Sequence, residues 1–136
     1  IDDFLSDNSI QLKELNLKSV NFSKIILEVV VDFLNNSDLS YKIEDLEIEI
    51  FSDKKYKNKI GESFNEDPVY IYPNENNELI SEIELDPFST GFTWLQNKLK
   101  GNEFVYIKMG VLVNYNNMKF PLSIKKKIKY NDSALD

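Results

Sequence analysis

Residues 24–51 decide the fold, and they read KIILEVVVDFL over 24–34, NNSD over 35–38 and LSYKIEDLEIEIF over 39–51. Two long apolar runs therefore flank a cluster of four turn-forming residues. β-branched residues dominate both runs, and apolar and polar residues alternate through most of the second run. This pattern is typical of two β-strands joined by a turn, and we predict a long β-hairpin.

Alternation assigns one face of each run to the core, because successive side chains of a strand point to opposite faces. The residues on these apolar faces are Ile25, Leu27, Val29, Val31 and Phe33 in the first run and Leu39, Tyr41, Ile43, Leu46, Ile48 and Ile50 in the second. The phase of the second run slips by one residue at Glu44–Asp45, and a similar slip occurs at Lys13–Glu14 within residues 10–20. We predict a β-bulge at each slip, since a bulge returns the apolar residues to one face.

The rest of the chain adds further short strands, and turn residues separate them at short intervals. We predict strands over residues 10–20, 60–64, 69–72, 78–85, 103–115 and 118–130, with a turn at Asn116–Asn117. A helix is expected at about residues 89–100, where Phe88, Phe92, Leu95 and Leu99 recur at helical spacing. The expected fold is an all-β sandwich of immunoglobulin- or fibronectin-III-like type, with seven to eight strands and this one short helix. Residues 10–130 are expected to form the single domain, between tails at 1–9 and 131–136.

Charge and composition limit the classes of partner. The chain has 136 residues and a net charge of −7, so we expect no binding of nucleic acid, whose phosphates repel an acidic surface. No stretch is long and apolar enough to be a transmembrane segment. The sequence starts at Ile1 rather than Met. We therefore expect a processed leader or lipid anchor upstream, and the periplasm or cell envelope rather than the cytoplasm, with a boundary chosen for expression as the alternative.

The residue types present argue against catalysis. Histidine and cysteine are absent, which removes Ser-His-Asp triads, cysteine nucleophiles and the usual zinc sites. The carboxylates of Glu82, Glu84 and Asp86 could form an acid/base pair, but we interpret them as a solvated strand face. The oxygen-rich segment 74–78 could hold Ca²⁺, but a solvated turn is the preferred interpretation. We therefore expect no enzyme, no catalytic residue, no cofactor and no metal ligand.

Two surface features have open interpretations. Lysines stand at positions 125, 126, 127 and 129 and could contact anionic headgroups or an acidic partner. The favoured alternative is an edge strand protected against aggregation, or a strand face that pairs with the acidic residues 44–49. Trp94 lies beside the apolar stripe of the expected helix and could form an exposed aromatic patch with Phe88 and Phe92. We favour a role for Trp94 in covering one end of the sandwich.

Three segments resemble one known family. Residues 17–35 followed by 39–43 are similar to a strand, an Asn-Pro-Asn-like turn and a second strand of the type-2 late-embryogenesis-abundant proteins, also called LEA14-like or WHy domains. Residues 59–62 resemble the short Ile/Val-Gly strand of that family, and residues 105–113 its penultimate strand with an internal glycine. The resemblance covers residues 10–130 and departs from the family at Asn36, where the family usually has Pro.

The resemblance implies a bacterial, non-enzymatic domain with a role in tolerance of desiccation or in the structure of the cell envelope. Bacterial members of the family are often exported or lipid-anchored. The alternative function is an immunoglobulin-like binding module that recognises a protein or carbohydrate partner through loops such as 53–59 and 74–77. The partner, protein or surface, is not specified by the sequence.

Overall fold

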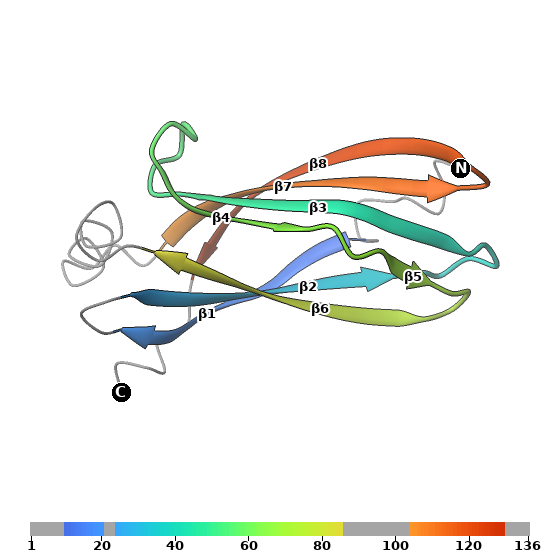
Figure 1. Cartoon of the computed structure of the whole chain (residues 1–136), viewed down its shortest axis with the longest axis horizontal. Coiled ribbons are helices and arrows are strands. Elements are labelled where there is room, and N and C mark those ends of the chain that lie inside the picture. The colour runs from blue at the N-terminus through green and yellow to red at the C-terminus, as the bar shows by residue number, and fades with distance from the viewer. Residues whose placement is uncertain (1–9, 21–23, 86–103, 130–136) are drawn as a thin grey trace.

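The computed structural model describes residues 10–20, 24–85 and 104–129, which form eight strands in two antiparallel sheets packed face to face (Figure 1). The strands are β1 Ile10–Val20, β2 Ile25–Leu34, β3 Tyr41–Phe51, β4 Lys59–Asn65, β5 Val69–Ile71, β6 Asn76–Leu85, β7 Phe104–Tyr115 and β8 Met118–Lys129. Sheet A has the order β1-β2-β6. Sheet B has the order β4-β3-β7-β8, with β5 also paired to β3.

The predicted all-β sandwich is confirmed. The helix expected at residues 89–100 lies outside the described residues, among which no helix is long and apolar enough to cross a membrane.

The core lies between the two sheets and is formed by the faces that alternation assigned to it. Ten of the eleven residues predicted for these apolar faces are buried. The eleventh, Leu39, precedes β3 and is partly buried against the core. The inward residues of β7 join them, namely Val105, Ile107, Met109, Val111 and Val113. Burial of this apolar surface is the main stabilising contribution to such a sandwich.

Both predicted bulges are present. The register of β1 on β2 shifts between Leu12 and Glu14, and the register of β3 on β7 shifts between Glu44 and Glu47. Asp45, at the second bulge, adopts a φ of 50°. Each bulge turns the strand so that apolar residues on both sides of it face the core. A second register shift in β1, between Leu17 and Ser19, was not predicted.

The predicted pairing of residues 24–34 with 39–51 is wrong. β2 pairs with β1 and β6 in sheet A, whereas β3 pairs with β4, β5 and β7 in sheet B. The segment 35–40 is therefore an arch that carries the chain from one sheet to the other. An arch places the apolar faces of β2 and β3 opposite each other across the core, whereas a hairpin would place them side by side on one sheet.

The two open sides of the sandwich are closed by different contacts. On one side, the Lys126 ammonium on β8 donates a hydrogen bond of 2.9 Å to the carbonyl oxygen of Leu12, at the first bulge of β1. On the other, β4 lies against β6, and the hydroxyls of Ser63 and Ser81 are 2.6 Å apart. Gly61 allows this approach, because a Cβ there would overlap the Leu85 side chain and lie 2.9 Å from Cγ2 of Ile83.

Candidate functional site

The arch between β2 and β3 is organised by the side chain of Asn35, the only buried polar residue among those described. Its amide nitrogen donates to the carbonyl oxygens of Leu39, at 2.6 Å, and Tyr72, at 3.0 Å. Its amide oxygen accepts from the backbone N–H of Ser37 at 3.1 Å and from the hydroxyl of Ser37 at 2.6 Å. The first of these acceptor bonds closes an Asx-turn, in which a side chain replaces a backbone turn contact.

Backbone hydrogen bonds fasten a second segment to this arch. The N–H of Asn35 donates to the carbonyl of Glu75 at 2.9 Å, and the N–H of Asn74 donates to the carbonyl of Ser37 at 3.3 Å. Residues 72–75 therefore lie against residues 35–39 and connect β5 to β6. The arch therefore holds Tyr72 in place at this end of the sandwich.

A groove of about 340 Å³ opens at this end of the molecule. It lies between the start of β3, the strand β5 with the residue after it, and the β7–β8 turn. The lining residues are Ser40, Tyr41, Lys42, Tyr70, Ile71, Tyr72, Asn114, Asn116 and Asn117. Tyr70 and Tyr72 are both more than half exposed and share one face of the chain because they are two residues apart. Asn116 and Asn117 take positive φ angles of 52° and 62°, which form the tight turn joining β7 to β8.

Charge in the groove is largely compensated. Glu44 lies 3.0 Å from the ammonium of Lys42 and 3.6 Å from that of Lys119, and it accepts a hydrogen bond of 3.3 Å from the amide of Asn114. The hydrogen bond from Lys42 is the largest cause of the lowered pKa of Glu44, and the same bond raises the pKa of Lys42. Burial raises the pKa of the Tyr41 hydroxyl to about 12, so Tyr41 remains neutral at physiological pH.

The groove is lined by side chains that bind ligands through stacking and hydrogen bonds. It offers flat aromatic rings together with amide groups that both donate and accept hydrogen bonds. Its volume lies within the range of about 300–1,000 Å³ that is usual for small-ligand sites. A neutral ligand with hydroxyl or amide groups matches these side chains.

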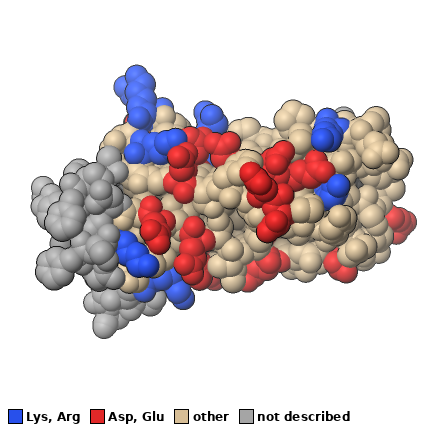
Figure 2. All heavy atoms as spheres, viewed as in Figure 1, with Lys and Arg blue, Asp and Glu red and all other residues tan. Residues whose placement is uncertain are grey.

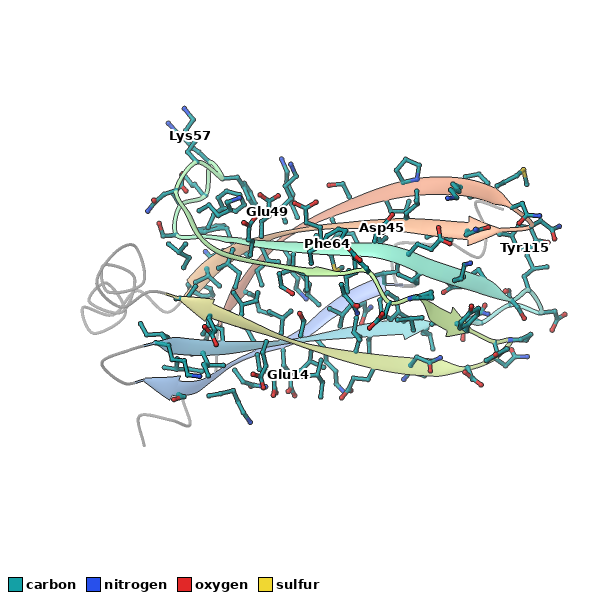
Figure 3. The ribbon with its side chains drawn as sticks, viewed as in Figure 1. Glu14, Asp45, Glu49, Lys57, Phe64 and Tyr115 are labelled. Carbon is teal, nitrogen blue, oxygen red and sulfur yellow. The ribbon has the colours of Figure 1, made fainter. Side chains whose placement is uncertain are left out.

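A cluster of three carboxylates lies on the outer face of sheet B. The oxygens of Glu47, Glu49 and Glu62 are within 4.8 Å of one another, a spacing that could hold a cation. Figure 3 labels Glu49 on β3 and Phe64 on the neighbouring strand β4, where Phe64 is the cross-strand partner of Glu47. The Lys59 ammonium already lies 3.3 Å from Glu49 and 2.9 Å from Glu62, and these contacts raise its pKa. Lys59 thus supplies positive charge to two of the three carboxylates, Glu49 and Glu62.

The other acidic groups considered from the sequence are exposed or have partners other than a metal ion or another acid. Glu82 and Glu84 are exposed on β6, where Glu84 lies 3.7 Å from Lys24, and Asp86 lies outside the described residues. In segment 74–78, Glu75 accepts a hydrogen bond from Asn77 while Glu78 is paired with Lys13. The sequence did not identify the groove, because its residues come from three distant segments. The one local signal for the groove in the sequence was that Tyr70 and Tyr72, two residues apart, lie on the same face of their strand.

The two loops suggested as binding loops do not meet. The connection 52–58 follows the end of β3, and residues 74–75 lie beside the arch that precedes β3 (Figure 1). The length of β3 therefore separates them, about 33 Å at roughly 3.3 Å per residue. Trp94 and its neighbours lie outside the described residues. Lys125, Lys127 and Lys129 do lie on the edge strand β8, as the favoured interpretation expected.

No protein-family model matches the sequence, and no match is found among curated proteins. Solved structures show the same fold. A protein from Archaeoglobus fulgidus has a TM-score of 0.58 at 12% identity, with 89% of this chain and 97% of that chain covered. A putative late embryogenesis abundant protein has a TM-score of 0.51 at 12% identity, with coverage of 92% and 72%.

Part of a larger protein also shares the fold. A β-glucuronidase of Bacteroides uniformis matches with a TM-score of 0.53 at 8% identity, covering 90% of this chain and 13% of the glucuronidase. At these identities the likeness concerns the fold alone. The chain is thus similar in architecture to proteins of different kinds, among them a late-embryogenesis-abundant protein.

Proposed function

We propose that this chain is a non-catalytic LEA14-like domain that protects other macromolecules during loss of water. The observation that carries the proposal is the fold likeness to a putative late embryogenesis abundant protein, which covers 92% of this chain. The sequence resemblance over residues 10–130 supports it independently. The net charge of −7 also favours a hydrated, soluble surface.

Protection of a client enzyme tests this function. A freeze-sensitive enzyme is dried or frozen with the chain, or with an equal mass of serum albumin, and its remaining activity is measured after rehydration. We expect the chain to preserve more activity than albumin does. Equal protection by albumin would contradict the proposal, since any bulky protein would then suffice.

The groove supports a second candidate function, a binding module for a carbohydrate or protein partner. Its two exposed tyrosines and three asparagines are the kind of lining that binds hydroxylated or amide-bearing ligands.

Binding in the groove is tested by NMR titration with oligosaccharides and peptides. We expect Tyr70→Ala with Tyr72→Ala to abolish the shifts. Phe64→Ala is the matched control, because Phe64 is as exposed as Tyr70 but lies outside the groove. Shifts that survive the tyrosine substitutions would exclude the groove.

A further inference from the structure

Half of the sixteen basic residues of this acidic chain lie at one end of the outer face of sheet B. We name this surface the lysine face; its members are Lys54, Lys55, Lys57, Lys59, Lys108, Lys125, Lys127 and Lys129. All eight are exposed. Register places them together: Lys125 pairs with Lys108, while Lys127 and Lys129 pair with the aromatic residues Tyr106 and Phe104. Figure 2 shows lysine atoms gathered at this end of the molecule, where the β3–β4 loop lies.

Aromatic contacts hold the β3–β4 loop over the same face. The ring of Tyr56 packs edge-on against the rings of Phe51 and Tyr106. The distances between ring centres are 5.4 Å and 6.1 Å, respectively. The ammonium of Lys125 lies 5.0 Å from the centre of the Tyr56 ring, and that of Lys127 lies 4.2 Å from the centre of the Phe104 ring. The loop lysines and the strand lysines are thus parts of one surface.

The loop is ordered by its own hydrogen bonds. The Asp53 carboxylate accepts from the backbone N–H of Asn58 at 2.7 Å and from that of Lys57 at 3.1 Å, and these bonds lower the pKa of Asp53. The Ser52 N–H donates to the carbonyl of Asn58 at 3.0 Å. Figure 3 shows Lys57 projecting away from the sandwich. Because the loop is already ordered, presenting its lysines to a partner costs little further conformational entropy.

Most of these lysines form no close ion pair with a described residue, and Glu49, the cross-strand neighbour of Lys108, is engaged by Lys59. Among the described residues, no carboxylate oxygen lies within 4.0 Å of the ammonium groups of Lys54, Lys55, Lys57, Lys108, Lys125 or Lys127. On the outer face of sheet A, by contrast, the lysines are paired with acids. Lys13 lies 3.0 Å from Glu78, and Lys18 lies 3.8 Å from Glu28. The two outer faces therefore differ in their electrostatic character.

We propose that the lysine face binds the surface of a membrane that contains anionic lipids. Its charges are spread over two strands and a loop, about 13 Å along β8 alone, rather than gathered around a pocket. Such a spread matches an extended surface of fixed negative charge better than it matches a small anion. Tyrosine and phenylalanine rings between the lysines are suited to the headgroup region, where amphipathic side chains accumulate.

The net charge of −7 does not oppose this orientation. The acids of sheet A lie on the far side of the sandwich, about 10 Å beyond sheet B, since that is the usual distance between packed sheets. This exceeds the Debye length of about 8 Å at physiological salt, so repulsion by those acids is strongly screened. On the near side, Glu49 and Glu62 are engaged by Lys59. Glu47, the third carboxylate of that cluster, stands opposite Gly110, four residues before the end of β3, and so lies farther from the β3–β4 loop than Glu49 does.

Vesicle co-sedimentation tests the proposal with the full chain. The vesicles are phosphatidylcholine alone, or phosphatidylcholine with about 30% phosphatidylglycerol, at low and at high NaCl. We expect binding to the anionic vesicles only, weakened at least about tenfold by high salt. Equal binding to both compositions, or none to either, would overturn the proposal. The proposal would also be overturned if the chain bound soluble polyglutamate or DNA but did not bind the vesicles.

Matched triple variants separate local from net charge. Lys108→Gln, Lys125→Gln and Lys127→Gln on the lysine face change the net charge from −7 to −10, and so do Lys13→Gln, Lys18→Gln and Lys24→Gln on sheet A. We expect the first triple to weaken vesicle binding by about tenfold or more and the second to leave it within about twofold. Equal losses would overturn the proposal. Lys54→Gln, Lys55→Gln and Lys57→Gln, all in the exposed loop, provide a second test if the strand variant does not fold.

Discussion

At the scale of single residues, Asn35 connects the arch to the segment around Tyr72. It continues the buried phase of Val31 and Phe33, so its amide lies where a core side chain would otherwise be. There it satisfies polar groups of the arch and of the segment around Tyr72 that would otherwise be buried without partners. Buried polar groups are costly when unpaired, so this side chain determines the conformation of both segments.

Replacing Asn35 with Ala should destabilise the protein by about 2–3 kcal/mol, because the carbonyls of Leu39 and Tyr72 and the N–H of Ser37 each lose a hydrogen bond. Urea unfolding measures the change. Asn36→Ala is the matched control, since Asn36 is exposed, and it should stay within about 0.5 kcal/mol. Equal effects of the two substitutions would contradict the role assigned to Asn35.

Tyr41 should make stability depend on pH in alkaline solution. Its pKa is about 12 in the folded state and about 10 when unfolded, so between these values the unfolded chain loses the proton that the folded protein keeps. The stabilisation present below pH 10 is therefore lost as pH rises toward 12. We expect the urea midpoint to fall more between pH 9 and pH 11 for the native chain than for Tyr41→Phe. Parallel decreases would show that Tyr41 does not contribute.

At the scale of elements, the sequence determined the strands, their buried faces and two bulges, but not the pairing of β2 with its neighbours. Alternation reports which face of a strand is buried, and that face is the same in a hairpin and in an arch. The six residues 35–40 exceed the two-residue turn of the tightest hairpins, and Asn35 sits in a core phase at the end of β2. These two features together are the local evidence for an arch. The groove was not predictable, because it depends on how β5 and the β7–β8 turn are placed around β3.

Gly61 is required by the approach of β4 to β6. Gly61→Ala should destabilise the protein by about 1–3 kcal/mol, since its Cβ would overlap the buried side chains of Leu85 and Ile83. Thermal or urea unfolding measures the loss. Gly110→Ala is the matched control, because a Cβ there has no atom within 4 Å, and we expect it to be nearly neutral. A neutral Gly61→Ala would show that β4 can move away from β6 at little cost.

At the scale of the whole molecule, the two sheets are held together by the core and by contacts at their open sides. The contact between Ser63 and Ser81 lies at one such side and joins sheet B to sheet A. The chain has no cysteine, so a single engineered disulfide can report on this geometry without competing thiols.

The double variant Ser63→Cys with Ser81→Cys should form a disulfide on mild oxidation, because the two hydroxyl oxygens are 2.6 Å apart. The disulfide joins two residues that are 18 positions apart in the sequence, and it should stabilise the protein by about 3 kcal/mol relative to the reduced form. Mass spectrometry and urea unfolding measure both effects. The pair Ser81→Cys with Ser123→Cys should remain reduced, since Ser123 faces outward on β8 in the other sheet. A disulfide in this pair would contradict the topology.

The arch also sets an order of events during synthesis. β3 ends at Phe51, and the strand that completes its pairing, β7, begins only at Phe104. A ribosome that has released the first half of the chain has therefore exposed a long apolar strand whose central partner does not yet exist. The β7–β8 hairpin joins strands two residues apart and can form as soon as it emerges, whereas pairing with β3 must close a long loop. We expect this domain to fold slowly and only after β7 has been synthesised, with β3 needing protection from aggregation until then.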